Sequence, residues 1–200
     1  MPGEILLSTA YLPPAEYFSL IKNAGDVFIE QEENYIKQTH RNRCKILAST
    51  GILVLTVPVM KGNLLKVQVK NITIDYSKRW QQVHIRALTS SYNRSPYFQF
   101  YFEDIEKIVL KNHKFLLDLN DELLFKCLEI LKVNKCILHT SSFNPDSGTN
   151  NDFRNRISPK EISGYQSRPY IQVFSSDGFE PGLSILDLIF NMGPESLGYI

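Results

Sequence analysis

Cysteine is scarce in this 200-residue chain, and its three cysteines include no CxxC pair. A zinc ribbon or a disulfide framework is therefore not expected, and free thiols fit a reducing, cytoplasmic compartment. Histidines and carboxylates also lack the spacing of a metal site. No glycine-rich phosphate-binding loop is present, which excludes nucleotide-binding sites of the Rossmann and P-loop types. The sequence therefore contains no motif that indicates a particular cofactor.

Long apolar runs and an excess of one charge are missing as well. No segment approaches the roughly eighteen uninterrupted apolar residues of a membrane span. The first residues lack the basic region and the long apolar region of a signal peptide. The chain has 22 basic and 21 acidic residues, a formal net charge of +1. Nucleic-acid binders usually carry a basic excess, so DNA or RNA is not expected as the main partner.

What the chain does contain is enough apolar material for a full core, with 43% hydrophobic and 12% aromatic residues. Apolar runs at 5–7 and 27–29 predict two strands, and the pattern between them predicts a helix that starts at Pro14 and ends before Gly25. A strand–helix–strand unit of this length is typical of a right-handed parallel crossover. It therefore predicts an α/β fold.

The remaining pattern extends this prediction over one domain, residues 1–200. Further strands are expected at 52–59, 67–75, 136–138 and 170–174, and further helices at 77–92, 97–112, 115–131 and 184–191. The unbroken apolar run at 52–59 favours a central strand, covered on both faces. The predicted fold class is α/β, with a mostly parallel or mixed central sheet covered by helices. The polar stretch at about 144–151 predicts a flexible loop within the domain.

The most informative segment is basic. Five side chains within nine residues are basic or potentially basic: Lys37, His40, Arg41, Arg43 and Lys45. If residues 38–46 are extended, one face carries Arg41, Arg43 and Lys45. The other face carries His40, Asn42 and Cys44. Arginines in a row on one strand face can clamp a phosphate or pyrophosphate. The alternative is a solvated edge strand whose charges discourage aggregation.

Three aromatic or imidazole side chains are further candidates. Tyr11 follows the first strand, where the loops of α/β sheets face the ligand crevice, although it could equally belong to the core. Trp80 and His84 are four residues apart and share one face of a predicted helix. They could stack on a ligand and transfer a proton, or they could form a half-buried helical face.

Asp187 interrupts the apolar run at 184–191. Its carboxylate either lies on the exposed side of a helix or is a buried partner for an arginine. A second Arg-Asn-Arg sequence, Arg154 to Arg156, repeats Arg41 to Arg43 and could converge on the same anion. Such a short match also arises easily by chance.

An ordered set of segments spans nearly the whole chain. It comprises Tyr-Leu-Pro at 11–13, Glu-Tyr-Phe at 16–18, Ala-Gly-Asp-Val-Phe at 24–28, His-Arg-Asn-Arg at 40–43, Leu-Thr-Val-Pro-Val at 55–59, and the segments 80–84, 92–98, 172–174 and 183–194. This set resembles the WbqC-like protein family. Members often have Gln-Pro before the Tyr-Leu-Pro turn and tryptophan after it. Here Thr9-Ala10 precede the turn and Pro14 follows it, a departure that suggests a different ligand or lost activity in this branch.

The resemblance implies a role in bacterial O-antigen, lipopolysaccharide or other surface-glycan biosynthesis. The leading hypothesis is a cytoplasmic enzyme that transfers a group from an activated sugar or acyl donor, with a nucleotide sugar or sugar phosphate as the anionic partner. Arg41 and Arg43 would hold the anion, Asn42 would orient a polar substituent, and Tyr11 would line the crevice. Trp80 would stack on the ligand, with His84 or His40 as general base and Asp187 as its orienting partner.

Two other hypotheses stay open. The chain could be a non-catalytic module that binds a phosphosugar or a protein within a biosynthetic complex. Alternatively, the arginines could be purely structural and pair with Asp187 and the acidic residues of 30–33. The apolar tail at 197–200 leaves a homo-oligomer open as a further expectation.

Overall fold

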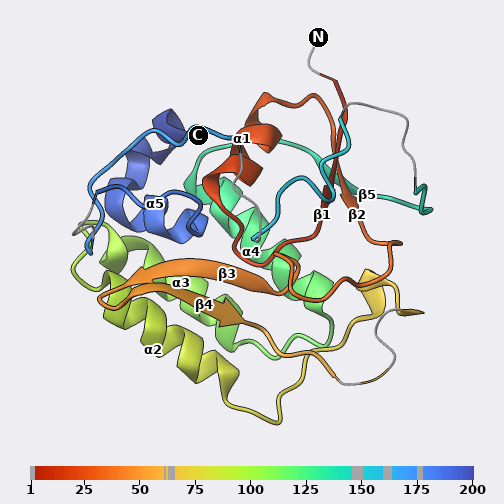
Figure 1. The fold of residues 1–200 in the computed structure, drawn as a ribbon, viewed down its shortest axis with the longest axis horizontal. Helices are drawn as coiled ribbons and strands as arrows, with labels where there is room; N and C mark the ends of the chain where they lie inside the picture. The colour runs from red at the N-terminus through yellow and green to blue at the C-terminus, as the bar shows by residue number, and fades with distance from the viewer. Residues whose placement is uncertain (1–2, 61, 63–65, 146–150, 160–163, 175–177) are drawn as a thin grey trace.

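In a computed structural model, residues 3–60, 62, 66–145, 151–159, 164–174 and 178–200 are described. The predicted crossover is confirmed: β1 (Ile5–Ser8), α1 (Ala15–Asn23) and β2 (Val27–Glu30) follow one another, and β1 and β2 pair in parallel. A third strand, β5 (Ile137–His139), also pairs in parallel with β2, so the sheet order is β1-β2-β5. This sheet lies at the upper right of Figure 1.

A short segment extends the parallel sheet beyond β1. Leu6 forms a parallel bridge with Asp152. The Leu6 amide donates to the carbonyl of Asn151 at 3.0 Å, and the Phe153 amide donates to the carbonyl of Leu6 at 2.8 Å. Four parallel segments therefore end at the same edge of the sheet, which is the edge where ligands bind in open α/β folds.

Helices cover the sheet and complete the α/β fold class. They are α1, α2 (Trp80–Tyr92), α3 (Phe98–Leu110), α4 (Leu116–Ile130) and α5 (Ile185–Met192), with the short 3₁₀ helices η2 (Val69–Asn71) and η3 (Gly193–Tyr199). The α1 helix buries Tyr17, Phe18 and Ile21, the apolar face that its sequence spacing predicts. The α3 helix packs against α4 and α5, so the helices share one core with the sheet.

The run at 52–59 is not the central strand that the sequence predicts. Residues Gly51–Thr56 form β4, which among the described residues pairs only with β3 (Arg43–Ala48), in an antiparallel hairpin. Ile52, Leu53 and Val54 are 47%, 40% and 47% exposed. The hairpin crosses the middle of Figure 1, with α2 below it. An unbroken apolar run does not itself reveal how many of its faces are covered, and here the covering elements reach mainly β3 and the end of β4.

Three other strand predictions also need correction. The strand predicted at 38–46 begins only at Arg43, so Arg41 lies in the turn before it and does not share a strand face with Arg43 and Lys45. Residues 67–75 form η2 and single bridges, and 170–174 form no strand, because neither segment meets a partner edge over several residues. The loop predicted at 144–151 falls mostly on residues 146–150, outside the described residues.

Two further findings concern membrane-spanning helices and metal-binding clusters. Among the described residues, no helix combines the length and the apolar character that a membrane crossing needs. Within the same part of the chain, no group of three or more histidine, cysteine, aspartate or glutamate side chains is arranged to hold a metal ion.

Candidate functional site

Buried polar groups connect the ends of the parallel segments. Ser8 Oγ, at the end of β1, donates to the backbone carbonyl of Arg154 at 2.9 Å. Arg154 Nη1 donates to Glu30 Oε2, at the end of β2, at 3.2 Å. Thr140, just after β5, donates its hydroxyl to Glu30 Oε1 at 2.7 Å. All four segment ends are thereby joined into one hydrogen-bonded network.

Arg41 belongs to this network and is neutralised within the chain. Its Nε and Nη2 donate to the two carboxylate oxygens of Glu33 at 2.9 and 2.6 Å, and Nη2 also donates to Ser8 Oγ at 2.7 Å. The side chain is almost fully buried. Arg154 is neutralised in the same way, by Glu30 and Asp152. The two Arg-Asn-Arg sequences thus converge on one edge of the sheet, where their first arginines bind the protein's own carboxylates.

Arg43 and Lys45 differ from Arg41. They are two residues apart on β3 and line one small cavity of about 130 Å³ together with His40. Among the described residues, neither cation has a carboxylate within ion-pairing distance, and the Nε of Arg43 is buried without a hydrogen-bond partner. We call this cavity the anion pocket. A buried donor without a partner usually marks the place of an ion or a water molecule.

One ring nitrogen of His40, Nε2, can accept a proton. Its Nδ1 lies 3.3 Å from the carbonyl oxygen of Arg43, so Nδ1 carries the proton and donates it, and Nε2 keeps its lone pair. Burial is the main cause that lowers the pKa of His40 to about 4, and nearby Lys45 lowers it further. The imidazole is therefore neutral at physiological pH. It lines both the anion pocket and a neighbouring larger cavity.

We call this larger cavity, which has a volume of about 360 Å³, the central cavity. The first residues of α1 and the residues just before α5 line it. The start of α1 suits an anion, because helix N-termini carry free N–H groups and a partial positive charge. Its charged lining residues are Glu16, Lys45, Arg168 and Glu180. The guanidinium of Arg168 lies 4.6 Å from the ring centroid of Tyr199, which holds it over that ring.

Tyr11, Trp80 and His84 come together in the interior and do not line the anion pocket or the central cavity. The Tyr11 hydroxyl lies 2.9 Å from His84 Nδ1, and the rings of Trp80 and His84 make an edge-to-face contact at 70°, with centroids 5.0 Å apart. All three side chains are buried. Burial also lowers the pKa of His84 to about 4. This arrangement holds α2 against the turn that follows β1.

Asn42 and Asp187 have partners elsewhere in the chain. Asn42 Nδ2 donates to the carbonyl of Val57 at 2.8 Å, which ties the start of β3 to the end of β4. Asp187 is fully buried, and its Oδ2 accepts from the Tyr170 hydroxyl at 2.7 Å and from Gln172 Nε2 at 2.8 Å. Burial raises the pKa of Asp187 above its ordinary value. Asp187 forms no ion pair with an arginine among the described residues, so that part of the structural interpretation is wrong.

The sequence gives no role to several residues that the fold brings to the site. Glu33 is not among them, because the structural hypothesis already pairs the arginines with the acidic residues of 30–33, and the Arg41–Glu33 ion pair confirms that pairing. Ser8 accepts a hydrogen bond from Arg41, and Arg168 reaches the central cavity from a segment without regular structure. No local motif marks these residues. His139 is a further case, since its Nε2 lies 2.9 Å from Asp121 Oδ2 at the end of β5. A histidine directly after a predicted strand was the only signal for it.

Acidification is expected to destabilise the protein through His40 and His84. Both have folded-state pKa values of about 4, below the ordinary 6.5. The unfolded chain therefore binds more protons in this interval, and the free energy of unfolding should fall as the pH drops from 6.5 towards 4. His139 acts in the opposite sense, because Asp121 raises its pKa and this stabilisation is lost as the pH rises.

Urea unfolding across this pH interval measures the effect. Replacing both His40 and His84 with asparagine should flatten the dependence over this interval, whereas His139→Asn should change it little there and should instead remove the loss of stability that occurs above pH 6.5. A wild-type stability that stays constant over the interval would contradict the prediction.

Comparisons with known proteins agree with the resemblance. A model of the WbqC-like protein family matches residues 9–161. The chain is also similar to a protein of Mycobacterium tuberculosis (strain ATCC 25618 / H37Rv) named "Uncharacterized protein Rv1507c". The two are 27% identical over 222 aligned positions, which cover 98% of this chain and 96% of the relative. No solved structure matches significantly.

Proposed function

Because the chain belongs to the WbqC-like protein family, we propose that it is an enzyme of bacterial surface-glycan biosynthesis that transfers a group from an activated sugar or acyl donor. One observation carries the proposal. Arg43 and Lys45, two cations without carboxylate partners among the described residues, line a cavity with the neutral imidazole of His40. A cation pair beside a base suits a donor whose leaving group is anionic.

The anion pocket would hold a phosphate group of the donor. Arg43 offers a planar fork of N–H donors, including the buried Nε, and Lys45 adds a second positive charge. A bound phosphate would supply the partner that Nε lacks. The remainder of the donor would extend into the central cavity, towards the N-terminus of α1.

His40 would act as the general base. Its Nε2 would accept the proton of an acceptor hydroxyl or amine as that group attacks the donor, and the proton would then pass to the leaving group. The negative charge of a bound donor raises the pKa of a neighbouring imidazole, which makes the base stronger when the donor is present.

The roles of the other candidate residues change within this proposal. Arg41 would support the turn that carries His40, instead of touching the donor. Asn42 would hold the hairpin in place, and Tyr11, Trp80 and His84 would support the site from the interior. Asp187 would position Tyr170, which lines the central cavity.

Replacing Arg43 with alanine should weaken binding of the donor about 10- to 100-fold, the value of one or two charge-assisted hydrogen bonds. Thermal-shift titrations with nucleotide sugars, sugar phosphates, coenzyme A esters and inorganic phosphate measure this, because a ligand of the folded state raises the melting temperature. Arg86→Ala, at an exposed arginine on α2, is the matched control. Equal shifts in wild type and Arg43→Ala would contradict the proposed anion pocket.

The alternative is a non-catalytic module that binds a phosphosugar or a partner protein in a biosynthetic complex. The low pKa of His40 favours it, because an imidazole with a pKa of about 4 is a weak base in the free protein. A ligand that binds through Arg43 but is not turned over with any acceptor would support this alternative.

A further inference from the structure

We propose that the donor is an acyl donor with a long hydrocarbon chain, and that this chain lies in an apolar groove beside the central cavity. This inference rests on the proposed function, because it takes the anion pocket and the central cavity as the place of the donor's head group. It narrows the donor from two classes, sugar or acyl, to one.

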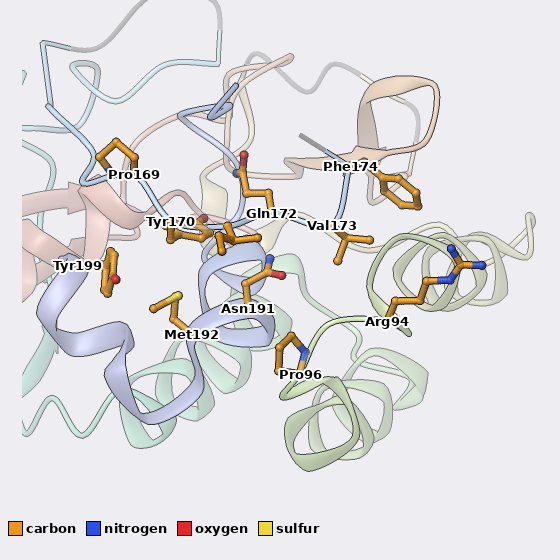
Figure 2. A pocket seen from close by; sticks show the side chains of 11 residues that line it. Arg94, Pro96, Pro169, Tyr170, Gln172, Val173, Phe174, Asn191, Met192 and Tyr199 are labelled. Atoms are coloured by element: carbon orange, nitrogen blue, oxygen red, sulfur yellow. The ribbon is translucent and has the colours of Figure 1, made fainter. Parts of the chain in front are cut away.

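The groove has a volume of about 870 Å³ and lies between the segment 169–174 and the end of α5. Figure 2 shows Tyr170, Gln172 and Val173 along that segment, with Asn191 and Met192 facing them from α5. Pro96, Pro169, Ile171 and Phe174 add further apolar surface. Ile171 is 87% exposed, so this surface is open to solvent.

Three of the polar side chains that line the groove, those of Tyr170, Gln172 and Asn191, are already hydrogen-bonded within the chain. Gln172 Nε2 donates to Asp187 Oδ2 and to the carbonyl of Glu180, while its Oε1 accepts from the Glu180 amide. Asn191 Nδ2 donates to the carbonyl of Asp187 at 2.7 Å, and the Tyr170 hydroxyl donates to the Asp187 carboxylate. A sugar needs many hydrogen-bond partners, whereas a hydrocarbon chain needs none.

Charge also distinguishes the groove from the anion pocket. Its one charged lining residue among the described residues is Arg94, which lies at the right of Figure 2, apart from Tyr170, Asn191 and Met192. Over the rest of the groove, the described residues offer a phosphate or nucleotide no cation. The lining suits an uncharged, apolar part of the donor.

The groove continues from the central cavity. Tyr170 and Tyr199 line both spaces, and their rings are perpendicular with centroids 5.8 Å apart. On α5, Leu188 lines the central cavity and Met192, one turn later, lines the groove. A donor with its anionic group near Arg43 and Lys45 would cross the tyrosine pair with its chain and reach the groove.

The test uses isothermal titration of the full chain with acetyl-, octanoyl- and dodecanoyl-coenzyme A. Each buried methylene should tighten binding about fourfold, the equivalent of about 0.8 kcal/mol, until the groove is filled. Val173→Asp places a charge in the groove and should abolish the dependence on chain length while leaving acetyl-coenzyme A binding intact. Val83→Asp, the same change at an exposed valine of α2, should bind like wild type.

The outcomes separate this inference from the proposed function. The groove is supported as an acyl site if the affinity rises with chain length in wild type and in Val83→Asp but not in Val173→Asp. Thioesters that bind equally at every chain length overturn the acyl inference and leave the anion pocket in place. If coenzyme A esters fail to bind while a nucleotide sugar binds through Arg43, the donor is a sugar and the inference is wrong. If none of these ligands binds, the proposed function fails as well.

A groove occupied by a second copy of the chain would give a different result. Val173→Asp would then convert a dimer to a monomer in size-exclusion chromatography, with thioester affinity independent of chain length. That result would also overturn the acyl inference.

Discussion

Replacing Arg41 with alanine should lower the free energy of unfolding by about 3–5 kcal/mol, because it leaves the buried carboxylate of Glu33 without its positive partner. Arg41 and Glu33 are 2% and 4% exposed, so water cannot replace the lost hydrogen bonds. The Ser8 hydroxyl would lose its guanidinium donor as well. Urea unfolding, followed by circular dichroism, measures the change.

Two further variants test this explanation. The double replacement Arg41→Met with Glu33→Leu removes both charges and should recover much of the lost stability, since a buried ion pair is often no better than apolar side chains of similar volume. Lys107→Ala breaks the exposed pair with Glu103 and should change stability very little. If Arg41→Ala were as stable as Lys107→Ala, the buried pair would not support the fold.

Replacing His40 with asparagine should lower the rate of group transfer about 10²- to 10⁴-fold, the usual contribution of a general base. Asparagine keeps an N–H donor for the carbonyl of Arg43 but has no basic nitrogen at the position of Nε2. The turn should therefore stay in place while proton transfer is lost. A steady-state assay with the donor found by the binding screen measures this effect.

The matched control is His113→Asn, because His113 is as buried as His40, at 8% exposure each, but lies away from the site in a pair with Glu122. The pH profile adds a second test. The pKa of about 4 predicts that kcat/KM falls only below about pH 4, and not near 6.5, because the base works in its neutral form. Full activity of His40→Asn would contradict the role of His40 as the general base.

Local patterns predicted the helical part of the fold well. The apolar faces of α1, α2, α3 and α4 follow the helical period, and the Pro14 and Ser184 boundaries lie where α1 and α5 begin. Such signals depend on neighbours three or four residues away, so they need no tertiary information. Strands require a partner edge from elsewhere in the chain. For this reason the apolar segments at 52–59 and 170–174 were wrongly predicted as a central strand and as a further strand.

In the candidate site, too, the sequence predicts some features, and others depend on partners that only the fold brings together. The sequence alone identified residues 37–45 as the basic segment, and Arg43 remains the proposed anion ligand. It could not distinguish Arg41 from Arg43, because both lie in the same Arg-Asn-Arg motif. Glu33 neutralises Arg41 and Ser8 of β1 accepts a hydrogen bond from it, whereas no carboxylate among the described residues reaches Arg43.

The sequence by itself determined the crossover unit, the helices, the family and the basic segment, because each depends on residue types at short, regular spacing. Only the tertiary structure decided which cations lack a carboxylate partner among the described residues, which histidine faces a cavity and which apolar surface adjoins that cavity. Those properties depend on burial and on partners distant in the chain. Ser8 and Arg41, for example, are 33 residues apart in the chain and meet only in the folded structure.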